Sequence, residues 1–173
     1  MPRRYFRRRS SNRDKYSIEQ TNIETQSSNT WPAVNVSETD PTLQNSRQFA
    51  IPIVPPVDSQ GMRKVKHLTF SISNNQSTSD SGPLFYTVAF VPQGYEPQPI
   101  QYPASGYAVN NYEANQFVMS SGVLDFTGGP LRIRCPLSRN LNSGDRIYLI
   151  LATAFAEQGS SYSAQVQYAI TNQ

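Results

Sequence analysis

Apolar and polar residues alternate with a period of two in several short stretches of the chain. In residues 66–73, "KHLTFSIS", the apolar residues Leu68, Phe70 and Ile72 alternate with Thr and Ser. Residues 131–137 and 162–170 alternate in the same way. A period of two is typical of a β-strand that buries one face, so each of these stretches predicts a half-buried strand.

Side-chain parity assigns a face to the residues of these stretches. In residues 131–137 the buried side is expected to hold Leu131, Ile133, Cys135 and Leu137. Arg132 and Arg134 then point the opposite way. In residues 162–170 the buried side is expected to hold Tyr162, Ala164, Val166, Tyr168 and Ile170.

Two further stretches, residues 83–91 and 146–155, are continuous apolar runs rich in β-branched and aromatic residues. Such runs indicate strands in the centre of a sheet, covered on both faces. Weaker strand patterns occupy residues 15–26, 47–54 and 115–124. Pro and Gly recur too often for long helices to form between these segments.

Eight predicted strands without helices indicate an all-β chain, and specifically an eight-stranded antiparallel jelly roll, a β-sandwich of two packed sheets. The turns "SGP", "PQG", "TGGP" and "NSGD" would connect the strands. Residues 92–114, rich in Pro, Gly and Tyr, are too long for a hairpin turn and predict an ordered surface loop.

Length and charge divide the chain into two parts. The 173 residues suit one domain. Residues 1–15 hold seven of the fifteen Lys and Arg residues against one acid, a net charge of +6, whereas residues 16–173 carry eight bases against eleven acids, a net −3. We expect a disordered or extended basic arm over residues 1–15 and a jelly-roll domain over residues 16–173. A polyanionic partner is the natural target of such an arm.

Cysteine content and hydropathy restrict the environment of the chain. A single cysteine, Cys135, allows no intrachain disulfide and is compatible with a reducing compartment. No apolar run approaches the roughly twenty residues that span a bilayer, and no secretory signal is evident, so we expect an unsecreted chain without membrane insertion. A mitochondrial transit peptide is disfavoured because the block of Arg7, Arg8 and Arg9 leaves no apolar stripe for an amphipathic helix.

The candidate catalytic residues do not form a pattern that indicates an enzyme. The one histidine, His67, begins a strand beside several cations and is a poor base there, so a surface or interface position is expected. Cys135 is in phase with apolar neighbours and is expected to be a small core residue. We find no carboxylate pair, nucleotide motif or metal-ligand cluster, and we predict no catalysis, no metal and no cofactor.

The arm interleaves Arg with aromatic residues, as in "RRYFRRR". Arginines bind phosphates, and aromatic rings stack on unpaired bases, so the pattern favours single-stranded nucleic acid without sequence preference. The predicted contacts in the arm are Arg3, Arg4, Tyr5, Phe6, Arg7, Arg8, Arg9, Arg13 and Lys15. A nuclear import signal, compatible with this role, would use Arg3, Arg4, Arg7, Arg8 and Arg9.

A second basic group, Arg63, Lys64 and Lys66, is predicted to contact nucleic acid as well. Lys64 and Lys66 share the parity of Leu68, so we expect them to continue the inward line of that strand past its edge. There they would either meet nucleic acid or lay their apolar stems along the core.

Several stretches resemble the capsid proteins of small circular single-stranded DNA viruses that encode their own replication initiator. They are the arm running into "KYSIEQTNIE", then "GMRKVKHLTFSIS", "FVPQGY", "NQFVMSSGV", "GPLRIRCPLSRNLNSGDRIYLILA" and "VQYAITNQ". "GMRKVKH" and "PLSRNLNSGD" are most similar to a circovirus-like branch, although the chain is short for a circovirus and nearer a nanovirus in size.

The resemblance implies a viral capsid protein whose jelly roll assembles, in sixty copies, into a T=1 icosahedral shell with arms turned inward onto a single-stranded DNA genome. It also implies location in the virion, passage through the host nucleus during assembly, and host import machinery and a cell-surface receptor as further partners. A coat protein of a small RNA or satellite virus would show the same arm and fold. A cellular jelly-roll binding module is a third alternative, for which the arm is unexpected.

Overall fold

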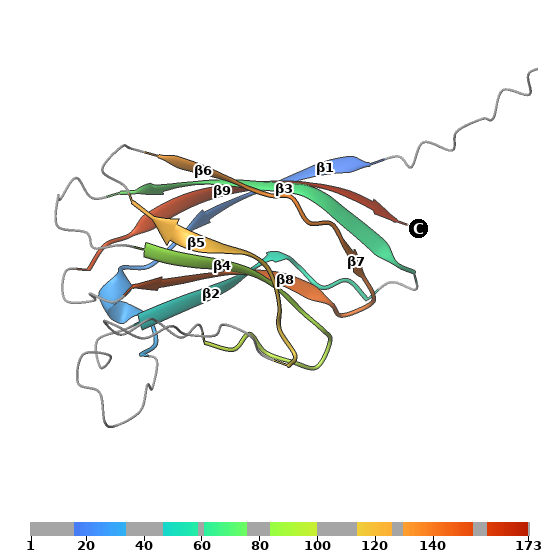
Figure 1. The fold of residues 1–173 in the computed structure, drawn as a ribbon, viewed down its shortest axis with the longest axis horizontal. Coiled ribbons are helices and arrows are strands. Elements are labelled where there is room, and N and C mark those ends of the chain that lie inside the picture. The colour runs from blue at the N-terminus through green and yellow to red at the C-terminus, as the bar shows by residue number, and fades with distance from the viewer. Residues whose placement is uncertain are drawn as a thin grey trace, which may run out of the picture.

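The alternating and apolar segments form strands in the computed structural model of the chain (Figure 1). The structure describes residues 16–33, 47–58, 61–75, 84–99, 114–125, 130–153 and 159–172. The basic arm therefore lies outside the described residues, as do residues 100–113 of the predicted surface loop. Across the described parts, no helix has the length and apolar character that crossing a membrane would take.

The strands form two antiparallel sheets that pack face to face, which confirms the all-β sandwich (Figure 1). The five-stranded sheet contains, in spatial order, β1 (Ser17–Glu24), β9 (Tyr162–Asn172), β3 (Arg63–Asn74) and β6 (Leu131–Cys135), with β7 (Arg139–Leu141) also paired to β3. The four-stranded sheet has the order β2 (Arg47–Val54), β8 (Arg146–Thr153), β4 (Leu84–Val91) and β5 (Phe117–Leu124). One 3-10 turn, η1 (Ser28–Thr30), follows β1.

All eight predicted strands are present, and the two continuous apolar runs form β4 and β8 in the centre of the four-stranded sheet. β2, which contains Pro52, is at an edge, where a missing backbone N–H costs no ladder hydrogen bond. The alternating residues of β3 and β9 bury one face each, as expected from their parity.

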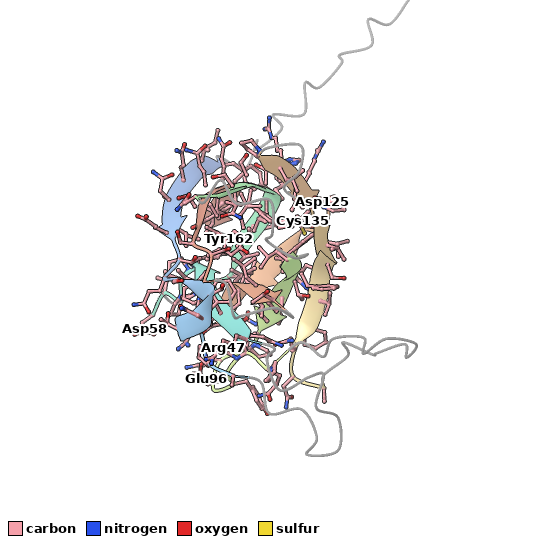
Figure 2. All side chains as sticks on the ribbon, turned by 90° about the vertical axis from the view of Figure 1, so that its left-hand side faces the viewer. Arg47, Asp58, Glu96, Asp125, Cys135 and Tyr162 are labelled. Atoms are coloured by element: carbon pink, nitrogen blue, oxygen red, sulfur yellow. The ribbon has the colours of Figure 1, made fainter. Side chains whose placement is uncertain are left out.

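The core lies between the sheets. Phe70 on β3 meets Tyr86 on β4 edge to face, with ring centroids 5.4 Å apart, so this pair joins the two layers. Figure 2 shows Cys135 and Tyr162 among the interior side chains. At one end of the core, Trp31 is fully buried between Phe49 and Tyr162, at centroid distances of 5.6 and 5.9 Å. The Trp31 indole N–H donates to the Gln26 carbonyl at 2.9 Å.

The predicted turn "NSGD" is held by Asp145. Its buried carboxylate accepts hydrogen bonds from the backbone N–H of Asn142 at 2.8 Å and of Gln93 at 3.1 Å. Gly144, at φ +79°, occupies the left-handed region, and a Cβ there would collide with the Gln93 side chain. The carboxylate thus ties this turn to the one that follows β4.

The prediction for the end of β6 is wrong. Leu137 was expected on the buried side, but the strand ends at Cys135 and Leu137 is 50% exposed. Pro136 explains the difference, because it has no N–H to continue the ladder with β3. The chain pairs with β3 again three residues later as β7, which sequence alternation did not reveal.

Candidate nucleic-acid interface

The predicted arm contacts, from Arg3 to Lys15, lie outside the described residues, so their roles stay predictions. The described part of the body starts at Tyr16, directly before β1. Ser17 at the start of β1 pairs with Ile170 of β9, which in turn pairs with Val65 of β3. The arm therefore joins the sandwich at the end of the five-stranded sheet where Lys64 and Lys66 lie.

An irregularity in β3 determines where these lysines point. Between Lys66 and Thr69 the register against β9 shifts by one residue, so that His67 and Leu68 together oppose Tyr168. His67 has φ 56°, in the left-handed region that His tolerates better than most residues. This is a β-bulge, in which one strand carries one extra residue.

The bulge reverses the parity of β3, so the expectation that Lys64 and Lys66 continue the inward line of Leu68 is wrong. Before the bulge, Arg63 and Val65 are buried while Lys64 and Lys66 are half-buried on the outer side. After it, Leu68 is buried and Thr69 is on the outer side. The two lysines thus lie on the solvent-facing side of the sheet.

Arg63 was predicted to contact nucleic acid, but the structure places it inside the fold. Only 5% of the residue is exposed, and its guanidinium donates to the carbonyls of Pro55 at 3.2 Å and Asp145 at 3.4 Å. These bonds join β3 to the segment after β2 and to the turn before β8. Arg63 is therefore a structural cation, and we remove it from the candidate interface.

Register brings two further cations to the same side as Lys66. Arg134 of β6 pairs with Thr69 and Arg132 pairs with Ser71, both on the outer side of β3. Arg132, Arg134 and His67 are exposed. We call the outer side formed by Lys64, Lys66, His67, Arg132 and Arg134 the basic face. Alternation in the sequence predicted that the two arginines point away from the core. Only the pairing of β6 with β3 shows that they lie beside the lysines.

A shallow groove of about 650 Å³ runs across the basic face. Its lining comes from four strands and consists of Ile18, His67, Thr69, Arg132, Arg134, Gln167, Tyr168 and Ala169. It contains no acidic residue. The adjoining hollow, further along the same sheet, is lined by Ser, Asn and Gln together with Ile, Ala and Pro, and includes Glu24. Of the two hollows, the one nearer the start of β1 is therefore the one lined by cations.

Lys66 links the basic face to the start of the body. Its ammonium lies 3.6 Å from the centroid of the Tyr16 ring, a close cation–π contact. Tyr16 is half-buried, and its hydroxyl is enclosed without a hydrogen-bond partner among the described residues. The contact fixes the residue that follows the arm against the basic face.

The two residues considered as catalytic candidates in the sequence, Cys135 and His67, lie in different environments. Cys135 is fully buried, as predicted, with its sulfur 3.7 Å from the Met119 carbonyl. Burial raises the pKa of its thiol, which keeps it protonated. His67 is exposed at the bulge, as expected for a surface histidine. Among the described residues no group of three or more His, Cys, Asp or Glu could hold a metal ion.

Comparison with protein-family models and with curated protein sequences finds no match. Among solved structures, one of infectious bursal disease virus Gt strain is similar, with a TM-score of 0.26 and 8% sequence identity. The similarity covers 92% of this chain and 41% of that chain, so this chain spans about two-fifths of its length. A likeness at this level carries no conclusion about function.

Proposed function

We propose that the chain is the coat protein of a small virus, which assembles into a closed shell and packages single-stranded nucleic acid through its basic arm. In the finer form that the sequence resemblance implies, the shell is a T=1 assembly of sixty copies around a circular single-stranded DNA genome. Host import machinery would recognise the same arm and bring the protein to the nucleus.

The observation that carries the proposal is the point on the body from which the arm extends. An arm of net charge +6 joins the sandwich at Tyr16, which lies under Lys66 at the charged end of the basic face. The cations of the basic face thus lie on the sheet where the arm, with its Arg and aromatic residues, begins. A shell needs this arrangement because its genome lies on one side only.

The strand order supports the jelly-roll form of the sandwich. β1 pairs with β9, β2 with β8, β3 with β6, and β4 with β5, so the pairings are nested around the middle of the chain. A chain folded back on itself and then wound into two sheets has this order, and so does a jelly roll with two Greek keys. β7 is an addition to that plan.

Charge balance also favours the proposal. Sixty arms of +6 would bring about 360 positive charges inside the shell, which offsets a sizeable minority of the phosphates of a genome of roughly one to two kilobases. Inorganic cations would neutralise the rest.

The proposal is tested by purifying the full-length chain and imaging it by electron microscopy, together with nuclease treatment of the extracted nucleic acid. We expect regular particles whose nucleic acid is sensitive to DNase. Nucleic acid sensitive to RNase would indicate the coat protein of an RNA or satellite virus. Sedimentation of the full-length chain as a small monomer that binds no nucleic acid would contradict the proposal and favour a cellular binding module.

A further inference from the structure

We propose that the basic face is a second binding surface for the phosphates of single-stranded nucleic acid, separate from the arm and centred on Lys66, Arg132 and Arg134. The inference rests on the proposed function, since it assumes that the chain packages nucleic acid. It extends the predicted binding beyond the arm and the lysines of β3 to Arg132 and Arg134, which the sequence did not assign to nucleic acid.

The spacing of the two arginines fits a line of phosphates. Arg132 and Arg134 are two residues apart on β6, which places their Cα atoms about 6.7 Å apart along the strand. Both point outward and are exposed. This separation is comparable with that of successive phosphates in a stretched single strand, so each guanidinium would reach a different phosphate.

The charge of the basic face is not compensated from within the described residues. The one salt bridge found there joins Arg146 and Glu96 at 3.6 Å and involves no residue of the basic face. Glu19 on β1 lies near the groove but pairs with Tyr168, whose side chain packs inward, and so it points away from the outer side. The unpaired cations therefore present a site for a polyanion.

The chemistry of the groove indicates what is recognised. Guanidinium groups bind phosphate oxygens through paired hydrogen bonds. Thr69 and Gln167 supply hydroxyl and amide groups that bond to phosphate or sugar oxygens, and the exposed ring in the groove is the small imidazole of His67, since Tyr168 is only 5% exposed. Binding here should thus be independent of sequence and dominated by charge, unlike binding to the arm, which contains Tyr5 and Phe6.

The position of Tyr16 connects the two surfaces. Lys66 holds Tyr16 against the sheet. A nucleic-acid strand that leaves the arm would therefore reach Lys66 on β3 first, and then Arg134 and Arg132 on the neighbouring strand β6. A nucleic-acid strand bound at one of these two surfaces is therefore at high effective concentration for binding to the other surface. The two surfaces should act on one nucleic-acid strand.

The test measures binding of a fluorescent single-stranded DNA oligonucleotide to the full-length chain over a range of salt concentrations. Replacing Arg132 and Arg134 with Gln removes two phosphate contacts, so the log–log salt slope should become shallower by about 1.4. Arg146→Gln is the matched control, because it removes one charge from β8 of the other sheet and should leave the slope unchanged. The melting temperature of each variant shows that it is folded.

A second double variant, Arg132→Lys with Arg134→Lys, separates charge from geometry. It should keep the wild-type slope but bind more weakly, because an ammonium cannot form the paired bonds of a guanidinium. Wild-type slope and affinity in the Gln double variant would overturn the inference while leaving the proposed function intact. If the full-length wild-type chain fails to bind, both fail. Loss of assembly in the Gln variant without change in DNA binding would instead make the basic face a contact between copies, and would also overturn the inference.

Discussion

The Lys66 ammonium lies over the Tyr16 ring, 3.6 Å from its centroid, and joins the strand β3 to the residue that follows the basic arm. The Tyr16 hydroxyl takes no part in this contact and has no partner among the described residues. The ring and the hydroxyl therefore make separable contributions.

Substitution of Tyr16 separates them. Tyr16→Ala should lower the free energy of unfolding by about 1 kcal/mol or more, through loss of the cation–π contact and of ring burial. Tyr16→Phe should be neutral or slightly stabilising, because it keeps the ring and removes an enclosed hydroxyl without a partner. Urea unfolding of both variants measures the difference, and equal destabilisation by the two substitutions would show that the hydroxyl is bonded.

Arg63 should behave as a structural residue despite its place in the basic stretch "MRKVK". Arg63→Met keeps much of the apolar stem but leaves the Pro55 and Asp145 carbonyls without their donor, at a cost of about 1–3 kcal/mol. The salt slope for single-stranded DNA should not change. A folded Arg63→Met variant with a shallower slope would return this residue to the nucleic-acid interface.

Trp31 should be among the most sensitive positions in the body. It is fully buried and packs on both Phe49 and Tyr162, so Trp31→Ala should cost about 3–5 kcal/mol of stability. Trp31→Phe should cost less, since it keeps aromatic packing and loses mainly the hydrogen bond to Gln26. Thermal unfolding followed by circular dichroism tests this order. Val123→Ala, at an exposed residue, is the control variant and should cost little stability.

Stability should fall at alkaline pH. Burial raises the pKa of the Tyr162 phenol above its ordinary value of about 10, and burial also raises that of Tyr168. The folded chain thus holds these protons more tightly than the unfolded chain, so the stabilisation is present below about pH 10 and is lost as the pH rises through the raised values. Unfolding midpoints between pH 8 and 12 test this, and Tyr162→Phe should reduce the loss.

Within the arm, the aromatic residues should add affinity without adding salt dependence. Replacing Tyr5 and Phe6 with Ala should weaken binding of single-stranded DNA by roughly 1–3 kcal/mol per lost stack while the salt slope stays constant. Replacing Arg3, Arg4, Arg7, Arg8, Arg9 and Arg13 with Gln should instead flatten the slope by about 4 and abolish packaging. Unchanged packaging by the arginine-free arm would limit the arm to nuclear import.

The strands were predictable because burial of one face imposes a visible period on residues such as Leu68, Phe70 and Ile72. β7 was not predictable, because its three residues are too few to show a period and its pairing with β3 depends on the interruption at Pro136. The burial of Trp31 was also missed, because it lies outside any strand and is fixed by contacts with β2 and β9.

The candidate interface was predicted only in part, for the same physical reason. Local sequence identifies cations, but which of them share a surface depends on pairing between distant strands. Arg134 lies 65 positions from Thr69, yet the two pair across neighbouring strands. Arg63, conversely, is next to Lys64 in sequence but is enclosed by groups from the segments around Pro55 and Asp145.

The extra residue at His67 sets the phase of everything before it in β3. If His67 instead took an ordinary strand conformation, without the bulge, the alternation would run unbroken back from Leu68 and the two sides would be exchanged, with Lys64 and Lys66 facing the core and Val65 and Arg63 facing the solvent. Deletion of His67 itself would leave a regular strand with the same residues on each side, because the bulge absorbs one extra residue. In alignments of related sequences, a one-residue gap at this point would therefore mark a chain without the bulge but with the same distribution of charge between its interior and its surface.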